Sequence, residues 1–251
     1  MRQSNAKEGS TESGFLCKFA HYCYSQMKKC FLLALLFTGI AAFAGEPYFC
    51  TSGGRKLFYE RYKAGTSKVI QTTELNVISV VKDGPERNVN YWMSVRKADG
   101  REMYGGRLDL VATIKANGDA LTDFGGTVKC VVKNHFPNVD VTSSGDLAVV
   151  PVEMKVGDTL PDAHCVVDVS GIQFKVDLTD RTVLRREMLA TPAGSFDCVV
   201  VREHRRENGP MHHNEIWTDT WYAPDIGYVR HDHFNKKLRL ESSEILVREE
   251  R

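Results

Sequence analysis

Strand-type patterning runs through almost the whole chain after residue 56 and constrains the fold more than any other feature. Short stretches rich in Val, Ile, Thr, Tyr and Phe alternate with Gly, Asn, Asp and Pro, as in strands joined by turns. Apolar residues at helical spacing are weak, and no long stretch combines them with helix caps. The predicted strands are 57–62, 68–81, 89–95, 108–114, 128–132, 147–154, 165–169, 172–178, 182–188, 196–204, 211–222, 226–234 and 238–247. We therefore predict an all-β fold: a long curved antiparallel sheet, as a half-barrel or open barrel, with little helix.

The last quarter of the chain gives the clearest prediction, a meander of four strands. The Asn-Gly pair at 208–209 is preferred in type I′ hairpin turns. A turn there would pair Val200 with Trp217 on the next strand. The following hairpin would then pair Trp221 with Tyr228, an aromatic pair of the kind that stabilises antiparallel strands.

Residues 27–44 have the features of a secretory signal peptide. A basic patch at Met27-Lys28-Lys29 precedes an apolar run from Cys30 to Ala41, and small residues stand two apart at Ala42 and Ala44. The run is shorter than the roughly 20 residues of a transmembrane helix. We predict cleavage near Ala44, export to the periplasm or the cell exterior, and no transmembrane span in the mature chain.

The predicted signal also sets the domain boundaries. Signal peptides begin at or near the initiator Met, so we interpret residues 1–26 as a disordered upstream over-extension and Met27 as the true start. Residues 45–251 are predicted to form a single β-rich domain, because no low-complexity linker divides them.

The charge of the mature chain argues against one class of partner. Residues 1–44 hold five of the 33 Lys and Arg residues and two of the 32 Asp and Glu residues, which leaves 28 basic and 30 acidic residues. A chain this close to neutral lacks the strong positive field that binds phosphate backbones. We therefore predict no nucleic-acid partner.

Four of the seven cysteines lie in the mature chain, and they are the disulfide candidates: Cys50, Cys130, Cys165 and Cys198. In an oxidising compartment an even number is compatible with two disulfides, in three possible pairings. Buried free thiols are the alternative, because a chain of this size does not need disulfides to fold. The cysteines have no C-x-x-C spacing, which disfavours a thiol oxidoreductase or a zinc knuckle.

No residue pattern identifies a catalytic or metal site, so we assign no catalytic residues and no cofactor. Ser195 lies in a turn before a strand and lacks the nucleophile elbow of hydrolases. His231 and His233 are the strongest metal candidates, since His-x-His on a strand places two imidazoles on one face. The predicted register brings no third ligand to them. We interpret these histidines as surface or rim residues and predict no metal.

Aromatic residues suggest a binding surface. Tyr91, Trp92, Trp217, Trp221 and Tyr228 are the candidates to line a concave ligand-binding face. Ordinary core packing is the alternative, because aromatic residues are also common in strands and cores.

Several motifs together resemble a family of exported bacterial proteins known only as a domain of unknown function. They are residues 191–198 (TPAGSFDC), Ile216-Trp217, Trp221-Tyr222-Ala223, residues 226–230 (IGYVR), residues 241–246, Tyr59-Glu60-Arg61-Tyr62 and residues 157–161 (GDTLP). The resemblance covers most of residues 47–248. It implies a long curved antiparallel sheet, similar to the half-barrels of periplasmic lipoprotein carriers. It implies no established activity and no catalytic residues.

Three hypotheses for the function follow. The first is a non-enzymatic envelope protein that binds an apolar or amphipathic ligand, such as a lipid, a lipoprotein segment or a glycan, within the curved sheet. The second is a structural or protein-interaction module of the envelope, recognised by an exposed edge strand or apolar patch. The third is a metal-dependent hydrolase on the His-rich strands, which requires three converging ligands.

Overall fold

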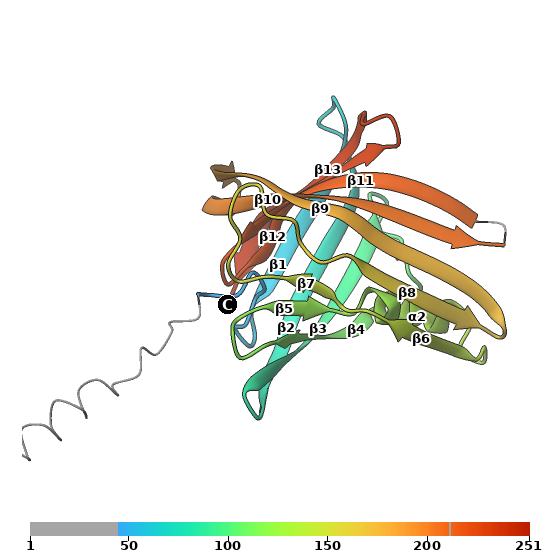
Figure 1. Ribbon diagram of the computed structural model, residues 1–251. Coiled ribbons are helices and arrows are strands. Elements are labelled where there is room, and N and C mark those ends of the chain that lie inside the picture. Colours follow the sequence, from blue (N-terminus) through green and yellow to red (C-terminus); the bar gives the residue numbers. More distant parts are fainter. Residues whose placement is uncertain (1–44, 211) are drawn as a thin grey trace, which may run out of the picture. The chain divides into compact units, whose positions relative to one another are not determined.

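The computed structural model describes residues 45–210 and 212–251, which form one antiparallel sheet and a helix (Figure 1). The elements are β1 (Lys56–Lys63), β2 (Val69–Asp83), β3 (Glu86–Lys97), β4 (Leu108–Ile114), β5 (Ala120–Thr122), α2 (Phe124–His135), β6 (Val141–Gly145), β7 (Ala148–Val150), β8 (Ala163–Val169), β9 (Ile172–Thr191), β10 (Gly194–Gly209), β11 (His212–Ala223), β12 (Gly227–Asn235) and β13 (Leu240–Glu250). The predicted all-β fold with little helix is confirmed. The predictions for the signal peptide and for residues 1–26 lie outside the described residues.

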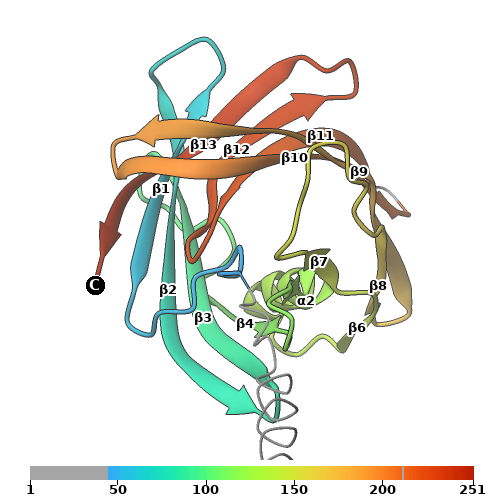
Figure 2. The same cartoon turned by 60° about the vertical axis from the view of Figure 1, so that its left-hand side comes forward.

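The 13 strands follow the order β6-β8-β9-β10-β11-β12-β13-β1-β2-β3-β4-β5-β7, so β6 and β7 are the two edges of an open sheet. These edge strands are neighbours in the chain, joined only by Asp146 and Leu147. The two edge strands are not hydrogen-bonded to each other, so only this short connection of the chain links the two edges of the sheet. The sheet curls so strongly that β3 and β11 contribute to one cavity, and Figure 2 shows them on opposite sides of the interior.

Burial alternates along the strands and identifies the inner face of the sheet. In β2 the buried residues are Gln71, Thr73, Leu75 and Val77, with more exposed residues between them. A period of two is the geometry of a strand with one face inside, because successive side chains point to opposite faces. The buried positions of β2 therefore mark the interior, and two of them are polar.

The helix α2 was not predicted, and its centre was assigned to a strand at 128–132. Asp123 caps the helix, since its side chain accepts a hydrogen bond from the Gly126 backbone N–H at 2.6 Å. Its apolar residues Phe124, Val128 and Val132 recur every four residues and pack on a second core cluster, with Val141, Cys165, Val167 and Val176. The two glycines that follow Phe124 weaken the helical pattern in the sequence.

The predicted meander β10-β11-β12-β13 is confirmed, but its register is wrong. Val200 lies opposite Trp221, not Trp217, because β10 remains paired as far as Gly209, which lies opposite His212. Gly209 does not provide the predicted turn. A Cβ atom there would lie 2.4 Å from the Phe174 ring, so this glycine allows close packing instead.

The next hairpin is displaced as well. A register shift between Trp221 and Tyr222 places Trp221 opposite Arg230 and Tyr222 opposite Tyr228. Such a bulge changes the direction in which the side chains beyond it point. As a result, the two tyrosines face each other on the inner surface of the sheet.

Candidate functional site

A row of polar side chains crosses the inner face of the sheet. The strand register places Thr220 opposite His231, His231 opposite Glu244, Glu244 opposite Arg61, and Arg61 opposite Gln71. Directly opposed residues of neighbouring strands share a face. We call these five residues, together with Thr73, Thr218 and His233, the polar belt.

Polar contacts link Arg61, Glu244 and Thr73 in one group, and Thr220 and His231 in a second. Arg61 Nη2 forms an ion pair with Glu244 Oε2 at 2.9 Å, and the Thr73 hydroxyl donates to Glu244 Oε1 at 2.6 Å. His231 Nδ1 lies 2.7 Å from the hydroxyl of Thr220. The buried carboxylate therefore has a cation and a hydroxyl donor, which offset the cost of removing it from water.

Three buried polar atoms of the belt have no hydrogen-bond partner in the structure. They are Arg61 Nε, Thr218 Oγ1 and His233 Nε2. A buried donor or acceptor left unpaired costs about 1–3 kcal/mol, so such atoms are normally satisfied by protein, water or ligand. These three atoms are the buried polar groups of the belt that still have hydrogen-bonding capacity to spare.

The two histidines of the belt are neutral at physiological pH. Burial lowers the pKa of His231 to about 3, and the Arg61 guanidinium adds to the effect. Burial also lowers the pKa of His233 to about 2, with smaller contributions from His231 and Arg61. The sequence suggested surface or rim histidines; the structure places both half-buried in the lining of the interior cavity described next.

Two adjoining cavities lie inside the sheet. The first, of about 260 Å³, is lined by the polar belt except Thr218, and also by Met93, Val95 and Tyr104. The second, of about 210 Å³, is mainly aromatic and apolar. Met93, Tyr222 and Tyr228 line both cavities, so the polar and aromatic parts form neighbouring compartments of one site.

Stacked rings give the aromatic cavity its shape. The Tyr59 and Tyr228 rings stack with centroids 4.3 Å apart, and the Tyr59 hydroxyl donates to the Tyr228 carbonyl oxygen at 3.0 Å. Phe49 meets Tyr91 edge-on at 5.3 Å. Burial raises the pKa of Tyr59, Tyr91 and Tyr228, so all three remain neutral phenols.

Of the five predicted ligand-binding aromatics, the structure places Tyr91 and Tyr228 in the aromatic cavity. Trp92 alternates with the cavity residues of β3 and therefore points to the other face. There Arg107 lies 5.8 Å from its ring.

Trp217 and Trp221 share that outer face. Trp217 stacks on His204 at 4.3 Å. The guanidinium groups of Arg185 and Arg230 lie 5.3 and 4.7 Å from the centre of the Trp221 ring. Such cation–π contacts help to hold the indole in place within the protein.

The four candidate disulfide cysteines, Cys50, Cys130, Cys165 and Cys198, are free thiols in the structure. Burial raises the pKa of all four, to about 11 for Cys165 and about 12 for Cys198. Thiols held in the protonated form are poor nucleophiles. Cys50 also lines the aromatic cavity.

Residues 45–210 and 212–251 contain no group of three or more His, Cys, Asp or Glu side chains that could hold a metal ion. His231 and His233 adjoin, with ring centroids 4.5 Å apart. The hypothesis of a metal-dependent hydrolase requires a third ligand, which these residues do not provide.

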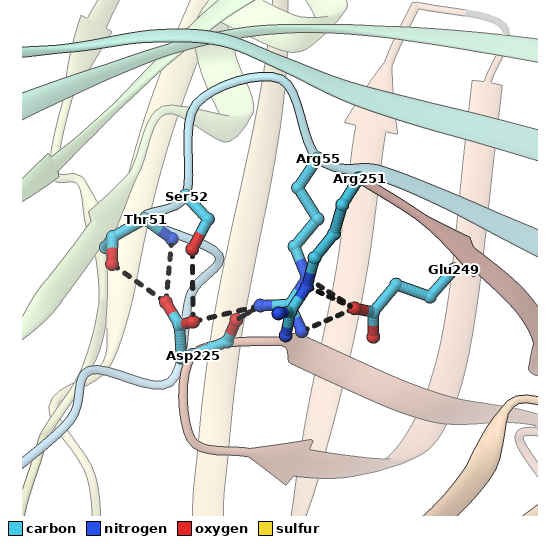
Figure 3. Close-up of polar contacts among 6 residues, drawn as sticks. All are labelled: Thr51, Ser52, Arg55, Asp225, Glu249 and Arg251. Atoms are coloured by element: carbon cyan, nitrogen blue, oxygen red, sulfur yellow. Dashed lines mark hydrogen bonds and ion pairs between the residues drawn. The ribbon is translucent and has the colours of Figure 1, made fainter.

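Residues 46–55 form an N-terminal strap, which supplies Tyr48, Phe49 and Cys50 to the aromatic cavity. Asp225, in the turn between β11 and β12, holds this strap in place (Figure 3). Its carboxylate accepts hydrogen bonds from the backbone and hydroxyl of Thr51, at 3.1 and 2.8 Å, and from Ser52 at 3.3 Å. It also pairs with Arg55 at 2.9 Å.

We expect Asp225→Ala to lower the free energy of unfolding by about 2–3 kcal/mol, because the buried Arg55 guanidinium loses one of its two carboxylate partners. Asp225 has a φ of 51°, which asparagine tolerates, so Asp225→Asn should lower the free energy of unfolding by less than Asp225→Ala does. Urea unfolding measures both variants, with Asp99→Ala of the exposed Asp99–Arg101 pair as the control. Equal stability of Asp225→Ala and the wild type would show that the strap is held by other contacts.

Within the described part of the chain, none of the helical structure is long and apolar enough to cross a bilayer. None of the curated proteins matches the sequence.

Two solved structures are similar to this one. A candidate exported protein with a YmcC-like fold from Bacteroides fragilis has a TM-score of 0.65 and 24% identity, over 82% of this chain and 100% of its own. A candidate lipoprotein from Parabacteroides distasonis has a TM-score of 0.66 and 18% identity, over 82% of this chain and 99% of its own. At these identities the likeness shows the fold alone.

The family resemblance found in the sequence is also confirmed. The model of the DUF3108-like family matches residues 52–246, which is most of the chain and all of the sheet except parts of its last strand. The protein belongs to the DUF3108-like family.

Proposed function

We propose that this protein is an exported, non-enzymatic binding protein that holds an apolar or amphipathic ligand inside its curved sheet. The observation that carries the proposal is the aromatic cavity beside a polar belt with three unpartnered buried atoms. Ligand sites are typically concave and largely apolar, with a few polar groups that fix orientation. Each cavity alone has a smaller volume than the 300–1,000 Å³ that is usual for ligand sites, but the two volumes together reach the lower part of this range.

Export is the second part of the proposal. The features of residues 27–44 support it, and two proteins of similar fold are described as an exported protein and a lipoprotein. We propose that residues 27–44 are removed and that residues 45–251 act as one domain outside the cytoplasm.

Native mass spectrometry of the protein purified from its own envelope fraction tests both parts. We expect an N-terminus near residue 45 and a bound small molecule that is released on unfolding. A protein that retains Met27, or carries no small molecule even under gentle extraction, would contradict the corresponding part.

A variant that fills the interior tests whether the bound molecule lies there. Met93→Trp places a larger side chain where the two cavities join, so we expect the bound fraction to fall at least tenfold. Val111→Trp on β4 is the control, because Val111 is 49% exposed. Thermal unfolding of both variants separates blocking from misfolding. Retention of the molecule by a folded Met93→Trp protein would place its site elsewhere.

A further inference from the structure

We propose that the ligand is an uncharged amphiphile, whose oxygen-bearing head group contacts Arg61 and His233 and whose apolar part lies in the aromatic cavity. This proposal rests on the function proposed above and specifies its ligand class. The supporting observations are the balance of charge in the polar cavity, the type of its free polar atoms and the position of the aromatic residues.

The polar cavity has no charge left over for an ionic head group. Arg61 is paired with Glu244 at 2.9 Å, and Arg205 on β10, which also acts on the belt histidines, is paired with Glu207 at 2.7 Å. A second buried carboxylate, phosphate or ammonium would have to be accommodated without a counter-ion. Burial of an unpaired charge is strongly unfavourable, whereas a hydroxyl or ester needs only hydrogen bonds.

The histidines do not supply the missing charge. The groups that face them are Glu244 from β13, Arg61 from β1, Arg205 from β10, Tyr228 from β12 and Tyr104 from the loop after β3. The cations among these groups act with burial to favour the neutral imidazole. A neutral imidazole offers one donor and one acceptor, which suits a neutral partner.

The unpartnered atoms of the cavity match an alcohol or an ester. Arg61 Nε can only donate, and His233 Nε2 donates or accepts according to its tautomer. A hydroxyl group can complement both in either tautomer, and an ester oxygen can accept from both when His233 Nε2 carries the proton. A quaternary ammonium can neither donate nor accept, and a carboxylate can accept but brings a charge that the cavity does not balance.

The apolar part of the ligand has a defined place. Tyr222, Tyr228 and Met93 form the boundary between the two cavities, so a chain that leaves the polar belt enters the aromatic cavity directly. Tyr59, Tyr91 and Leu75 then provide apolar surface on three neighbouring strands.

Three probes with the same twelve-carbon chain test the proposal: 1-monolauroylglycerol, lauric acid and dodecyltrimethylammonium. Binding is measured by isothermal titration calorimetry on the purified protein after extraction of any bound molecule, at pH 7.5 and 5.5. We expect the monoglyceride to bind at least tenfold more tightly than either ion, with an affinity that changes less than twofold between the two pH values. Laurate that binds as tightly as the monoglyceride at pH 7.5, where its carboxylate is ionised, would overturn the proposal, whereas tighter laurate binding at pH 5.5 is expected because part of it is then the uncharged acid.

Two substitutions locate the head group. His233→Leu removes one of the two proposed head-group contacts, and we expect it to weaken monoglyceride binding at least fivefold. The matched control is His164→Leu, at an exposed position of β8. Equal affinities for the two variants would contradict the assignment. If no probe binds but native mass spectrometry still shows a bound molecule, the ligand class is wrong and the proposed binding function stands; if neither shows a ligand, both fail.

Discussion

Glu244→Ala is expected to lower the free energy of unfolding by about 2–4 kcal/mol, because it removes the carboxylate partner of the half-buried Arg61 guanidinium. Glu244 is 4% exposed, and its carboxylate also accepts the hydrogen bond of Thr73. The substitution therefore leaves a positive charge and a hydroxyl donor without their acceptor. Urea unfolding followed by circular dichroism gives the difference directly.

The double variant Arg61→Met/Glu244→Met distinguishes the effect of removing the whole ion pair from the effect of leaving one charge without its partner. An apolar pair of similar volume leaves no buried charge, so we expect stability to return to within about 1–2 kcal/mol of the wild type. Asp197→Ala, which breaks the half-exposed Arg186–Asp197 pair, should cost no more than about 1 kcal/mol. A double variant as unstable as Glu244→Ala would show that the loss arises from packing and not from charge.

This comparison also bears on why the pair is present. If the apolar double variant folds well, the ion pair is not needed for stability, and a role in binding becomes the simplest reason for a charged network in the interior. The same variant should then bind monolauroylglycerol more weakly, because Arg61 Nε is one of the two proposed contacts.

Strand alternation and turn residues predicted the curved sheet and the β10–β13 meander, because both signals are local. The register was not predictable in the same way. Asn208-Gly209 has the ideal turn sequence, yet Phe174 of β9 packs against Gly209 and keeps it within β10. A contact between strands that are distant in sequence overrides a local preference.

The helix α2 was missed for a related reason. Only three apolar residues mark its inner face, and the glycines at 125 and 126 reduce its intrinsic propensity. Close approach explains one of these glycines, since a Cβ atom at Gly125 would lie 3.3 Å from the Cys165 sulfur. Tertiary packing decides the structure here.

The site was predictable only in part. Tyr91 and Tyr228 were identified as aromatic candidates, but alternation alone does not say which face of a strand is interior, so Trp92, Trp217 and Trp221 were included. A usable signal was present: polar residues recur two apart in Gln71–Thr73, Thr218–Thr220 and His231–His233. Only the cross-strand pairing shows that these three pairs meet on one inner surface.

The buried histidines should make the protein less stable in mild acid. Their pKa values are lower in the folded protein than the value of 6.5 of a free histidine, so the unfolded chain binds more protons below pH 6.5. Stability is therefore complete above pH 6.5 and declines as the pH falls from there toward 3. One histidine contributes at most about 1.4 kcal/mol per pH unit. Because both rings line a cavity that admits water, we expect roughly half of this limit, or about 2–3 kcal/mol for the pair between pH 6.5 and 4.5.

The double variant His231→Gln/His233→Gln isolates this contribution from that of the other titrating groups. Glutamine keeps hydrogen-bonding capacity but does not titrate, so the variant should lose less stability than the wild type as the pH falls from 6.5 to 4.5. His164→Gln is the control of opposite sign: the hydrogen bond that the imidazole donates to Asp177 raises the pKa of this exposed histidine, so its small contribution is present at low pH and is lost as the pH rises. Identical pH profiles for the double variant and the wild type would mean that the belt histidines take up protons as readily in the folded protein as in the unfolded chain. The cavity would then gain positive charge in mild acid, contrary to the expected pH-independent binding of an uncharged ligand.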